Sequence, residues 1–292
     1  MVGQVAELGE WISEGGVVVL SGAGLSTDSG IPDYRGPSGS ARRGTPMTYQ
    51  TFTGDPVARQ RYWARSHLGW RTIGDAAPND GHRAVADLQE LGLVDGIITQ
   101  NVDGLHQAAG ASGVIELHGN LARIACLHCG ELTGRTEMAA RLDAVNPAFA
   151  GVATAINPDG DAELDDAALD GFAVVDCLGC GGLLKPDVVY FGETVPPDRV
   201  ASSFGLVAAA RTLLVLGSSL TVMSGRRFVL RAAKLGVRVA IVNRGVTRGE
   251  PYAGIVIDAP LGIVLPHLAR EAAARRSPNY DRSARSPEKI RI

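Results

Sequence analysis

The stretch VVVLSGAGLSTDSGIPDYRG, residues 17–36, opens with four apolar residues in a row, the length of a buried strand. Gly22 and Gly24 follow, as in the turn where a parallel strand delivers a phosphate to the next helix. The third glycine of that fingerprint is missing, because Thr27 occupies its place. The chain then continues as a polar segment to Arg35, so the stretch predicts a nucleotide-binding turn with an added polar arm.

Outward from this stretch, short apolar strands alternate with segments of helical periodicity. Such alternation predicts a parallel sheet that is covered by helices on both faces. We therefore predict an α/β fold with a Rossmann-like, doubly wound parallel sheet that binds ligands beyond the carboxyl ends of its strands. The expected strands are 17–20, 94–99, 212–216 and 237–242, and the expected helices lie near 5–12, 82–91, 198–210 and 224–235.

Two segments interrupt the alternation. Residues 37–80 are rich in Gly, Pro and Arg and carry an aromatic cluster, which predicts a small helical insert. Residues 121–185 hold all four cysteines and predict a small inserted zinc-ribbon module. The Rossmann-like domain is then expected in three parts, and residues 271–292 are expected to form a basic, disordered tail. The three parts are 1–36, 81–120 and 186–270.

Charge and composition narrow the functional class. A formal net charge of -3 gives no general attraction for nucleic acid, which is expected to bind, if at all, only through the basic tail. No apolar run reaches the length of about 18 residues that a membrane helix needs. The first basic residue is Arg35, which fits neither a secretory signal nor a transit peptide, so we expect a cytoplasmic protein. The sequence leaves the oligomeric state open.

The cysteines form two knuckles, Cys126-Leu-His-Cys129 and Cys177-Leu-Gly-Cys180. Paired C-x-x-C turns allow four thiolates to converge on one tetrahedral ion, and a filled shell of four sulfurs is typical of structural zinc. A redox or disulfide role suits a cytosolic chain less well. We therefore predict a structural zinc site, with His128 as a bystander.

Polar residues follow the expected strands. Because the carboxyl ends of parallel strands meet at one edge of a sheet, we expect these residues to share one site with Gly22 and Gly24. Each signal is weak alone, since a Gly-Ser-Ser turn is more often only a turn. The segments in question are Thr99 to His106, Gly217 to Leu220 and Asn243 to Gly245.

One histidine, His118, lies just ahead of the cysteine-bearing insertion in the sequence Glu116-Leu-His-Gly-Asn120. A structural role is the simpler interpretation of an isolated histidine. Its position beside the polar strand ends favours a general base, because imidazole titrates near neutral pH.

Taken in order, these motifs resemble those of one known family. They are Gly22-Ala-Gly-Leu-Ser26, Ser29-Gly-Ile-Pro-Asp33-Tyr-Arg35, Thr99-Gln-Asn-Val-Asp103, His118-Gly-Asn120, the two cysteine knuckles, Lys185-Pro-Asp-Val-Val-Tyr-Phe-Gly-Glu193 and Gly217-Ser-Ser219. The set resembles the sirtuins, NAD-dependent protein-lysine deacylases, over roughly residues 5–270. Residues 59–65 and 158–162 are similar to the class II group of that family, which includes the fourth mammalian sirtuin.

The resemblance implies a Rossmann-like domain joined to a small zinc module, with NAD and an acylated-lysine protein meeting between them. It also implies that NAD is consumed: the acyl oxygen attacks C1′ of the nicotinamide ribose, nicotinamide leaves, and a histidine deprotonates a ribose hydroxyl. The acyl group then moves from lysine to ADP-ribose. The segment from Leu25 to Arg35 becomes a loop that closes over the ribose and is mobile without ligand. An alternative for the same fold is a protein mono-ADP-ribosyltransferase.

The resemblance assigns roles to individual residues. His118 becomes the general base, and Asn101 and Asp103 complete the catalytic set. The implied NAD contacts are Gly22, Ala23, Gly24, Ser26, Asp33, Tyr34, Arg35, Gln100, Gly217, Ser218, Ser219, Asn243, Arg244 and Leu261. The implied substrate contacts are Val102, Val189, Phe191, Gly192 and Glu193, and the implied zinc ligands are Cys126, Cys129, Cys177 and Cys180.

Three alternatives remain at this point. Tyr62 and Arg65 resemble a pair that reads acidic acyl groups, although the surrounding sequence favours a helix with core aromatics. A binding module without activity would require a defective catalytic set, whereas Asn101, Asp103 and His118 are all present. An ordinary dehydrogenase is disfavoured, because no acidic residue follows Gly24 at the expected distance in a simple strand-helix-strand unit.

Overall fold

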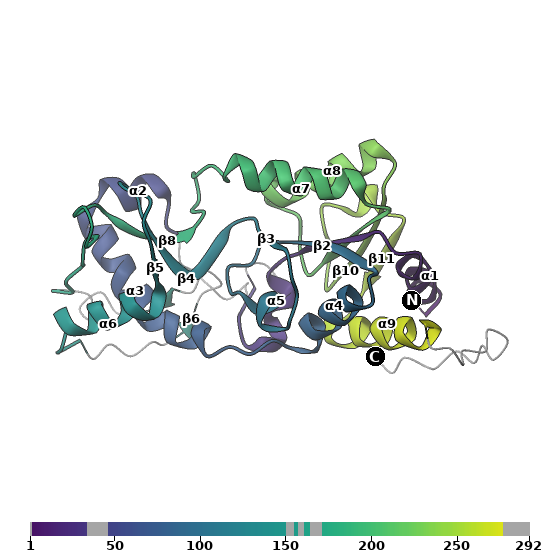
Figure 1. Cartoon of the computed structure of the whole chain (residues 1–292), viewed down its shortest axis with the longest axis horizontal. Helices are drawn as coiled ribbons and strands as arrows, with labels where there is room; N and C mark the ends of the chain where they lie inside the picture. Colours follow the sequence, from purple (N-terminus) through teal and green to yellow (C-terminus); the bar gives the residue numbers. More distant parts are fainter. Residues whose placement is uncertain (1, 34–45, 150–154, 157–160, 164–170, 277–292) are drawn as a thin grey trace.

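The computed structural model describes residues 2–33, 46–149, 155–156, 161–163 and 171–276. Within these residues the largest sheet has six strands, all parallel, in the order β11-β10-β9-β1-β2-β3 (Figure 1). The chain winds outward from the central β1 in both directions, which confirms the predicted Rossmann-like, doubly wound sheet. The strands are β1 (Val17–Ser21), β2 (Val94–Thr99), β3 (Val114–Glu116), β9 (Thr212–Leu216), β10 (Arg238–Asn243) and β11 (Ile255–Asp258).

Helices cover both faces of this sheet, and β1 shows why. Successive side chains of a strand point to opposite faces, so Val17 and Val19 enter one hydrophobic core while Val18 and Leu20 enter another. The first core lies under α1, α4 and α9, and the second under α7 and α8 (Figure 1). These helices are α1 (Val2–Ser13), α4 (Asp80–Glu90), α7 (Pro197–Ala209), α8 (Met223–Leu235) and α9 (Leu261–Arg276).

Three elements of this lobe were not expected from the sequence. Strands β3 and β11 are too short to give a clear apolar run, and they take their conformation from pairing with β2 and β10. Helix α9 runs to Arg276, so the prediction that a disordered tail begins at residue 271 is wrong. The stretch from Leu261 to Arg276 stays helical because Leu265, Leu268 and Ala272 are buried in the first core. Residues 277–292 lie outside the described residues.

The two insertions pack together into a second lobe (Figure 1). Phe52, Tyr62 and Trp63 from the helical insert share one hydrophobic core with Ile124 and Met138 from the cysteine-bearing segment. The elements of this lobe are α2 (Tyr49–Gly54), α3 (Pro56–Gly74), β4 (Gly119–Cys126), β5 (Leu132–Gly134), α6 (Arg135–Val145), β6 (Ala155–Ile156), β7 (Ala162–Glu163) and β8 (Leu184–Val188).

Local sequence determines where the long helix of this lobe begins. The Asp55 side chain accepts hydrogen bonds from the backbone N–H groups of Val57 and Ala58, at 2.9 and 3.0 Å. Pro56 occupies the first helical position, where its lack of an N–H costs nothing. The cap and the proline together fix the start of α3, which carries Tyr62 and Trp63 into the small-lobe core.

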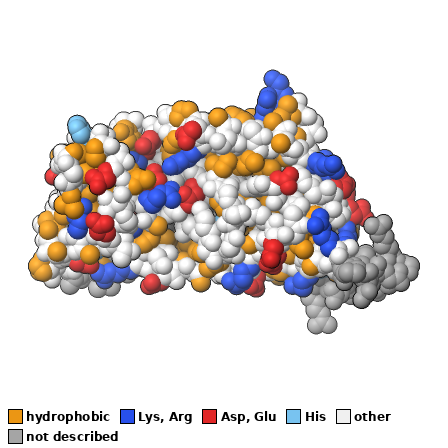
Figure 2. Space-filling view, in the orientation of Figure 1, with side chains coloured by type: hydrophobic (Ala, Val, Ile, Leu, Met, Phe, Trp, Pro, Cys, Tyr) orange, Lys and Arg blue, Asp and Glu red, His pale blue; other side chains and the backbone are white. Residues whose placement is uncertain are grey.

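One face of the molecule is of mixed charge. On the face seen in Figure 2, acidic and basic side chains are interspersed wherever the structure describes them. Among the described helices, none combines the length and the apolar character that crossing a membrane requires.

Candidate active site

A cavity of about 710 Å³ lies at the carboxyl ends of β1, β2, β9 and β10 and extends toward the small lobe. Nineteen of the predicted site residues line it: Gly22, Ala23, Gly24, Ser26, Asp33, Gln100, Asn101, Val102, Asp103, His118, Val189, Phe191, Gly192, Glu193, Gly217, Ser218, Ser219, Asn243 and Arg244. Leu261 is not among its lining residues and is buried instead in the core under α9. Tyr34 and Arg35 lie outside the described residues.

Glycines let two strand ends approach each other beneath this cavity. The Gly24 N–H donates to the Gly217 carbonyl at 2.9 Å, and the Gly22 N–H donates to Leu216 at 2.9 Å. A Cβ added to Gly22 would lie 2.8 Å from the Ser218 Cβ, closer than packed atoms allow. The turn after β1 therefore requires glycine, because a Cβ would fill the narrow space between this turn and the turn after β9. We call this space the glycine cradle.

The polar arm after Gly24 is partly regular. It forms two short 3-10 turns, Ala23–Leu25 and Thr27–Ser29, and Gly30 then takes a left-handed φ of 83°. Asn79 holds this arm, since its Nδ2 donates to the Leu25 carbonyl at 2.8 Å and to the Ser29 Oγ at 3.0 Å. The first part of the predicted loop is thus tied to the start of α4.

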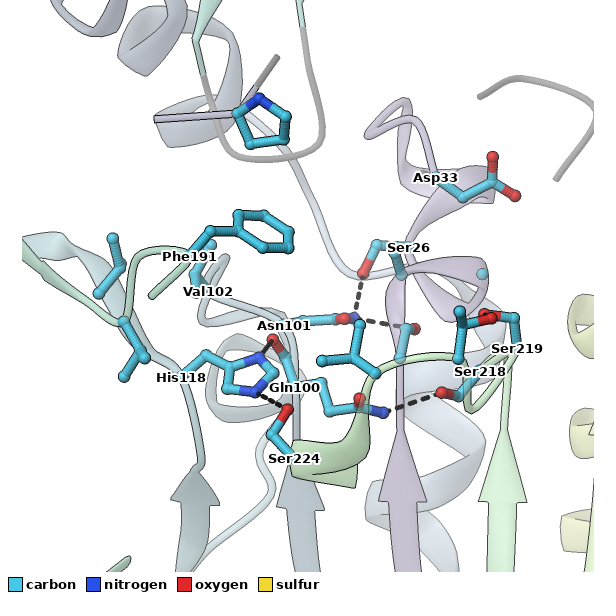
Figure 3. A pocket seen from close by; sticks show the side chains of 18 of the residues that line it. Ser26, Asp33, Gln100, Asn101, Val102, His118, Phe191, Ser218, Ser219 and Ser224 are labelled. Atoms are coloured by element: carbon cyan, nitrogen blue, oxygen red, sulfur yellow. Dashed lines mark hydrogen bonds between the residues drawn. The ribbon is translucent and has the colours of Figure 1, made fainter. Parts of the chain in front are cut away.

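His118 faces the cavity just before β4 (Figure 3). Its Nδ1 lies 3.0 Å from the Gln100 carbonyl oxygen, and its Nε2 lies 2.8 Å from the Ser224 Oγ. Burial lowers the pKa of His118 below its usual value, Arg227 and Arg199 act in the same direction, and the Gln100 carbonyl opposes them. The imidazole is therefore neutral near pH 7 and can accept a proton.

Asn101 and Ser26 are hydrogen-bonded next to the turn after β1 (Figure 3), and Asp103 joins them through Ser26. The Asn101 Nδ2 donates to the Gly22 carbonyl and to the Ser26 Oγ, both at 3.1 Å. The Ser26 hydroxyl donates to the Asp103 Oδ2 at 2.7 Å. Burial raises the pKa of Asp103, while the Leu105 N–H and the Ser26 hydroxyl oppose the shift. These contacts fix both side chains at the cavity wall without any ligand.

Two buried histidines lie beneath this group. The rings of His82 and His106 pack edge to face with centroids 5.2 Å apart. His82 Nε2 lies 3.4 Å from the Ser26 Oγ, and His106 Nε2 lies 2.9 Å from the Ser21 Oγ. Burial lowers the pKa of His82 to about 4 and that of His106 to about 3. Both rings are therefore neutral at neutral pH.

The predicted substrate segment follows β8 and connects the site to the small lobe. The Val189 N–H donates to the His118 carbonyl at 2.8 Å. The Glu193 carboxylate accepts from the Tyr190 N–H at 2.8 Å and from Lys185 at 3.2 Å. The Glu193 carboxylate is therefore bound by groups of the same segment. The Phe191 side chain, in contrast, is exposed at the cavity.

The four cysteine sulfurs lie within 4.8 Å of one another. The Sγ atoms of Cys126 and Cys180 are 3.5 Å apart, and those of Cys129 and Cys177 are 3.8 Å apart. Thiolates bound to a tetrahedral ion at about 2.3 Å would be roughly 3.8 Å apart, so the donor set fits zinc. A zinc ion held by these four sulfurs would cross-link the two cysteine knuckles, and it would have no open coordination position for a substrate.

A family model described as the Sir2 family matches residues 22–224, a span that contains the cavity turns after β1, β2 and β9, His118 and all four cysteines. The chain belongs to the Sir2, or sirtuin, family. NAD-dependent protein deacetylase 1 of Streptomyces coelicolor is 59% identical over 271 residues, which are 93% of this chain and 91% of that relative. NAD-dependent protein deacetylase 1 of Mycobacterium avium is 53% identical over 260 residues, with 87% and 91% covered.

Solved sirtuin structures share the fold. One described as "Structural Basis for the Mechanism and Regulation of Sir2 Enzymes" superposes with a TM-score of 0.75 at 29% identity, covering 94% of this chain and 100% of the other. Another, described as "Sir2-p53 peptide-NAD+", has a TM-score of 0.74 at 29% identity and covers 91% and 98%.

In this sirtuin the cavity has an apolar arm that reaches into the small lobe. Ile31, Ile73 and Leu121 line it, together with the aromatic rings of Tyr62 and Tyr190. Tyr62 is fully packed, with its ring centroid 5.4 Å from that of Tyr190, and burial raises its pKa. Arg65 is not among the lining residues, so the structure favours the interpretation of this helix as a carrier of core aromatics.

Sequence reasoning did not assign Ser224 and Arg227, which line the cavity, or His82, which contacts Ser26. His82 belongs to the capping box of α4, where Asn79 and His82 exchange hydrogen bonds, and an Asn-x-x-His pattern is a weak signal for it. Ser224 and Arg227 lie in the first turns of α8 and line the cavity. Their position shortly after the Gly217–Ser219 turn is the signal that could have found them.

Proposed function

We propose that this sirtuin is an NAD-dependent protein-lysine deacylase that consumes NAD and transfers the acyl group from lysine to ADP-ribose. The observation that carries the proposal is a neutral His118 that faces a cavity at the carboxyl ends of the strands. The printed names of its relatives, NAD-dependent protein deacetylases, support the same activity.

NAD fits the part of the cavity above the sheet. We propose that the glycine cradle after β1 and the Ser218 and Ser219 turn after β9 hold its phosphates, because backbone amides and hydroxyls can approach closely there. Asn243 would hold the adenosine ribose. Asn101 and Asp103 would hold the nicotinamide end, where their hydrogen bonds already fix them.

The acyl-lysine would enter from the opposite end. We propose that the peptide backbone pairs with residues 189–193 as an added strand, a mode that gives affinity with little sequence preference. Its acyl chain would lie in the apolar arm toward Leu121 and Tyr62. The acyl carbonyl oxygen could then reach C1′ of the nicotinamide ribose, and nicotinamide would leave.

His118 would act after that bond has broken. Its Nε2 would take the proton of a ribose hydroxyl, and the resulting alkoxide would attack the acyl carbon. The proton-accepting role requires a neutral imidazole, which the lowered pKa of His118 provides at neutral pH. The products would be free lysine, nicotinamide and O-acyl-ADP-ribose.

The test is an incubation of the purified protein with NAD and a panel of acyl-lysine peptides, followed by mass spectrometry. We expect nicotinamide and O-acyl-ADP-ribose in equal amounts, and a loss of about 10²-fold or more in acyl transfer for His118→Ala. His267→Ala, on α9 and away from the cavity, is the control. Full acyl transfer by His118→Ala would remove its proposed role, and ADP-ribose left on protein would instead indicate a mono-ADP-ribosyltransferase.

We further propose that the chain belongs to the class II group of sirtuins, on the strength of residues 59–65 and 158–162. Of these, 59–65 lie on α3, whereas 158–160 lie outside the described residues. We also propose that the chain consists of a Rossmann-like domain with two insertions, both of which contribute to the small lobe.

A further inference from the structure

Both ring nitrogens of His118 have a hydrogen-bond partner before any ligand binds. A carbonyl oxygen has no proton, so the contact with Gln100 requires that Nδ1 carries the hydrogen and donates it. In the neutral ring Nε2 then holds the lone pair. The Ser224 hydroxyl, 2.8 Å away, must therefore be the donor to Nε2 (Figure 3).

This arrangement restricts how His118 can receive a proton. A neutral imidazole has one lone pair, and here the Ser224 hydroxyl already occupies it. A substrate hydroxyl must either displace Ser224 or deliver its proton through Ser224. Ser224 lines the cavity, and among the described residues its Oγ has His118 as its only hydrogen-bond partner. Its oxygen therefore keeps lone pairs with which to accept from a substrate hydroxyl.

The start of α8, which carries Ser224, packs against Gln100. Ser224 lies in the first turn of α8, and its neighbour Gly225 packs against the Gln100 side chain so closely that a Cβ there would clash. The carbonyl of the same Gln100 holds the other side of the His118 ring. Gln100 thus contacts both α8 and the imidazole, through its side chain and its carbonyl.

We propose that Ser224 is a catalytic proton relay between the ribose hydroxyl of the substrate and His118. This inference rests on the proposed function and adds a residue to it. The ribose O–H proton passes to the Ser224 Oγ while the Ser224 proton passes to Nε2 of His118. Ser224 stays neutral, the imidazole becomes an imidazolium held by Gln100 and Ser224, and the ribose oxygen keeps the electron pair with which it attacks the acyl carbon.

The relay acts on acyl transfer and not on the earlier release of nicotinamide. The comparison is between wild type, Ser224→Ala and Ser224→Thr, with Ser203→Ala as the matched control. Ser203 is a buried helical serine whose hydroxyl bonds the Arg199 carbonyl and which does not line the cavity. Thermal melting of each variant checks that it folds.

We expect Ser224→Ala to slow formation of O-acyl-ADP-ribose by about 10- to 100-fold. Incorporation of labelled nicotinamide into NAD, which reports the reversible first step, should stay within about twofold of wild type. Ser224→Thr should restore most acyl transfer because it keeps a hydroxyl. A proton inventory in mixed H₂O and D₂O should indicate two protons in flight in wild type and one in Ser224→Ala.

The hydrogen bond itself can be measured without substrate. In ¹⁵N spectra of the ligand-free protein we expect His118 to carry its proton on Nδ1, and Ser224→Ala to shift the Nε2 resonance while leaving Nδ1 in place. A proton on Nε2 in wild type would overturn the relay, as would unchanged or faster acyl transfer in Ser224→Ala. Absence of any wild-type turnover would instead overturn the proposed function and the relay together.

Discussion

The two lobes hold their parts of the site by different means. The sheet lobe places its site residues at the ends of four neighbouring strands, between two hydrophobic cores that fill both faces of the sheet. Among the described residues the small lobe has one hydrophobic core, which includes Cys126 and Cys177, and its four cysteines converge at a single point. The difference indicates that the site residues of the sheet lobe are held by hydrophobic burial, and those of the small lobe by a metal cross-link.

Strand β4 is where the two means of support meet. It follows His118 directly and ends at Cys126, and it pairs at both of its ends with β8, which leads to the substrate segment. Gly119 takes a left-handed φ of 87° with its Cα against the Asp187 carbonyl, so no side chain fits there. A cross-link at one end of β4 therefore holds the general base at the other.

A charged bridge also joins the lobes. Arg123 on β4 donates to Glu116 on β3 at 2.7 Å and to Asp187 on β8 at 2.9 Å. Arg199 on α7 adds a longer contact of 3.5 Å to Asp187. Glu116 precedes His118 in the sequence and Arg123 follows it, so their contact holds the chain around the base to both lobes.

Metal removal should produce the largest effect, and it should act on one lobe. A structural zinc site contributes on the order of 10 kcal/mol to folding, so chelation or Cys126→Ser should unfold the small lobe and abolish acyl transfer. Trp63 and Trp70 lie in that lobe over Arg135, whereas Trp11 lies on α1. Fluorescence of Trp11→Phe protein should therefore report the loss.

Limited proteolysis provides the comparison with the sheet lobe. Early cleavage should fall within the two small-lobe segments, 49–74 and 119–188, while the fragments from the sheet remain protected. Zinc added back should restore the fluorescence and the protection. Unchanged melting of protein whose metal content has been measured as zero would contradict a structural site.

The sheet was predictable because its signal is local, whereas the small lobe depends on distant contacts. The apolar run at 17–20 and the glycines after it are sufficient to identify a parallel strand and its turn. No local pattern shows that Phe52 and Met138 share a core, because that depends on contacts across the two insertions. The strand β3 was missed for the same reason, since its pairing with β2 decides its conformation.

The site shows the same division. Residues on strand-end turns, such as Asn101 and Ser218, were predictable because the ends of parallel strands converge. Ser224 and His82 were not, because helix starts bring them to the site and neither carries a motif of its own. Leu261 was assigned to the site through resemblance alone, as a backbone contact, and its side chain is buried in the core under α9.

Acid should weaken the sheet lobe through its buried histidines, with a smaller effect than metal removal. The pKa of His82 is lowered to about 4 and that of His106 to about 3, while unfolded histidine titrates near about 6.5. The unfolded chain therefore binds more protons in this range, and stability is lost as the pH falls below about 6.5. Each ring should contribute roughly 2 kcal/mol of loss between pH 6.5 and 5.

Urea unfolding at pH 7.5 and pH 5 measures this loss, with zinc in excess so that the small lobe stays loaded. His106→Gln should reduce the difference between the two pH values by about 2 kcal/mol, whatever it does to stability at pH 7.5. An equal pH difference in wild type and His106→Gln would show that the buried histidine does not titrate with unfolding.

The smallest expected effect compares one helix cap from each lobe. Asp55 caps α3 of the small lobe through two backbone N–H groups, and Asp55→Ala should cost about 1 kcal/mol of stability. Asn79 caps α4 of the sheet lobe, and its amide also holds the polar arm at Leu25 and Ser29. Asn79→Ala should therefore cost about 2 kcal/mol and also raise KM for NAD, whereas Asp55→Ala should leave KM unchanged.

Asn79→Ser separates the two roles of Asn79. Serine keeps a capping acceptor for the Gly81 N–H but has no amide to donate to Leu25 and Ser29. Most of the stability should return while KM for NAD stays raised, as measured by urea unfolding and steady-state kinetics. If KM returned to the wild-type value with serine, the polar arm would be held by its own 3-10 turns, and the start of α4 would support the sheet lobe without shaping its half of the site.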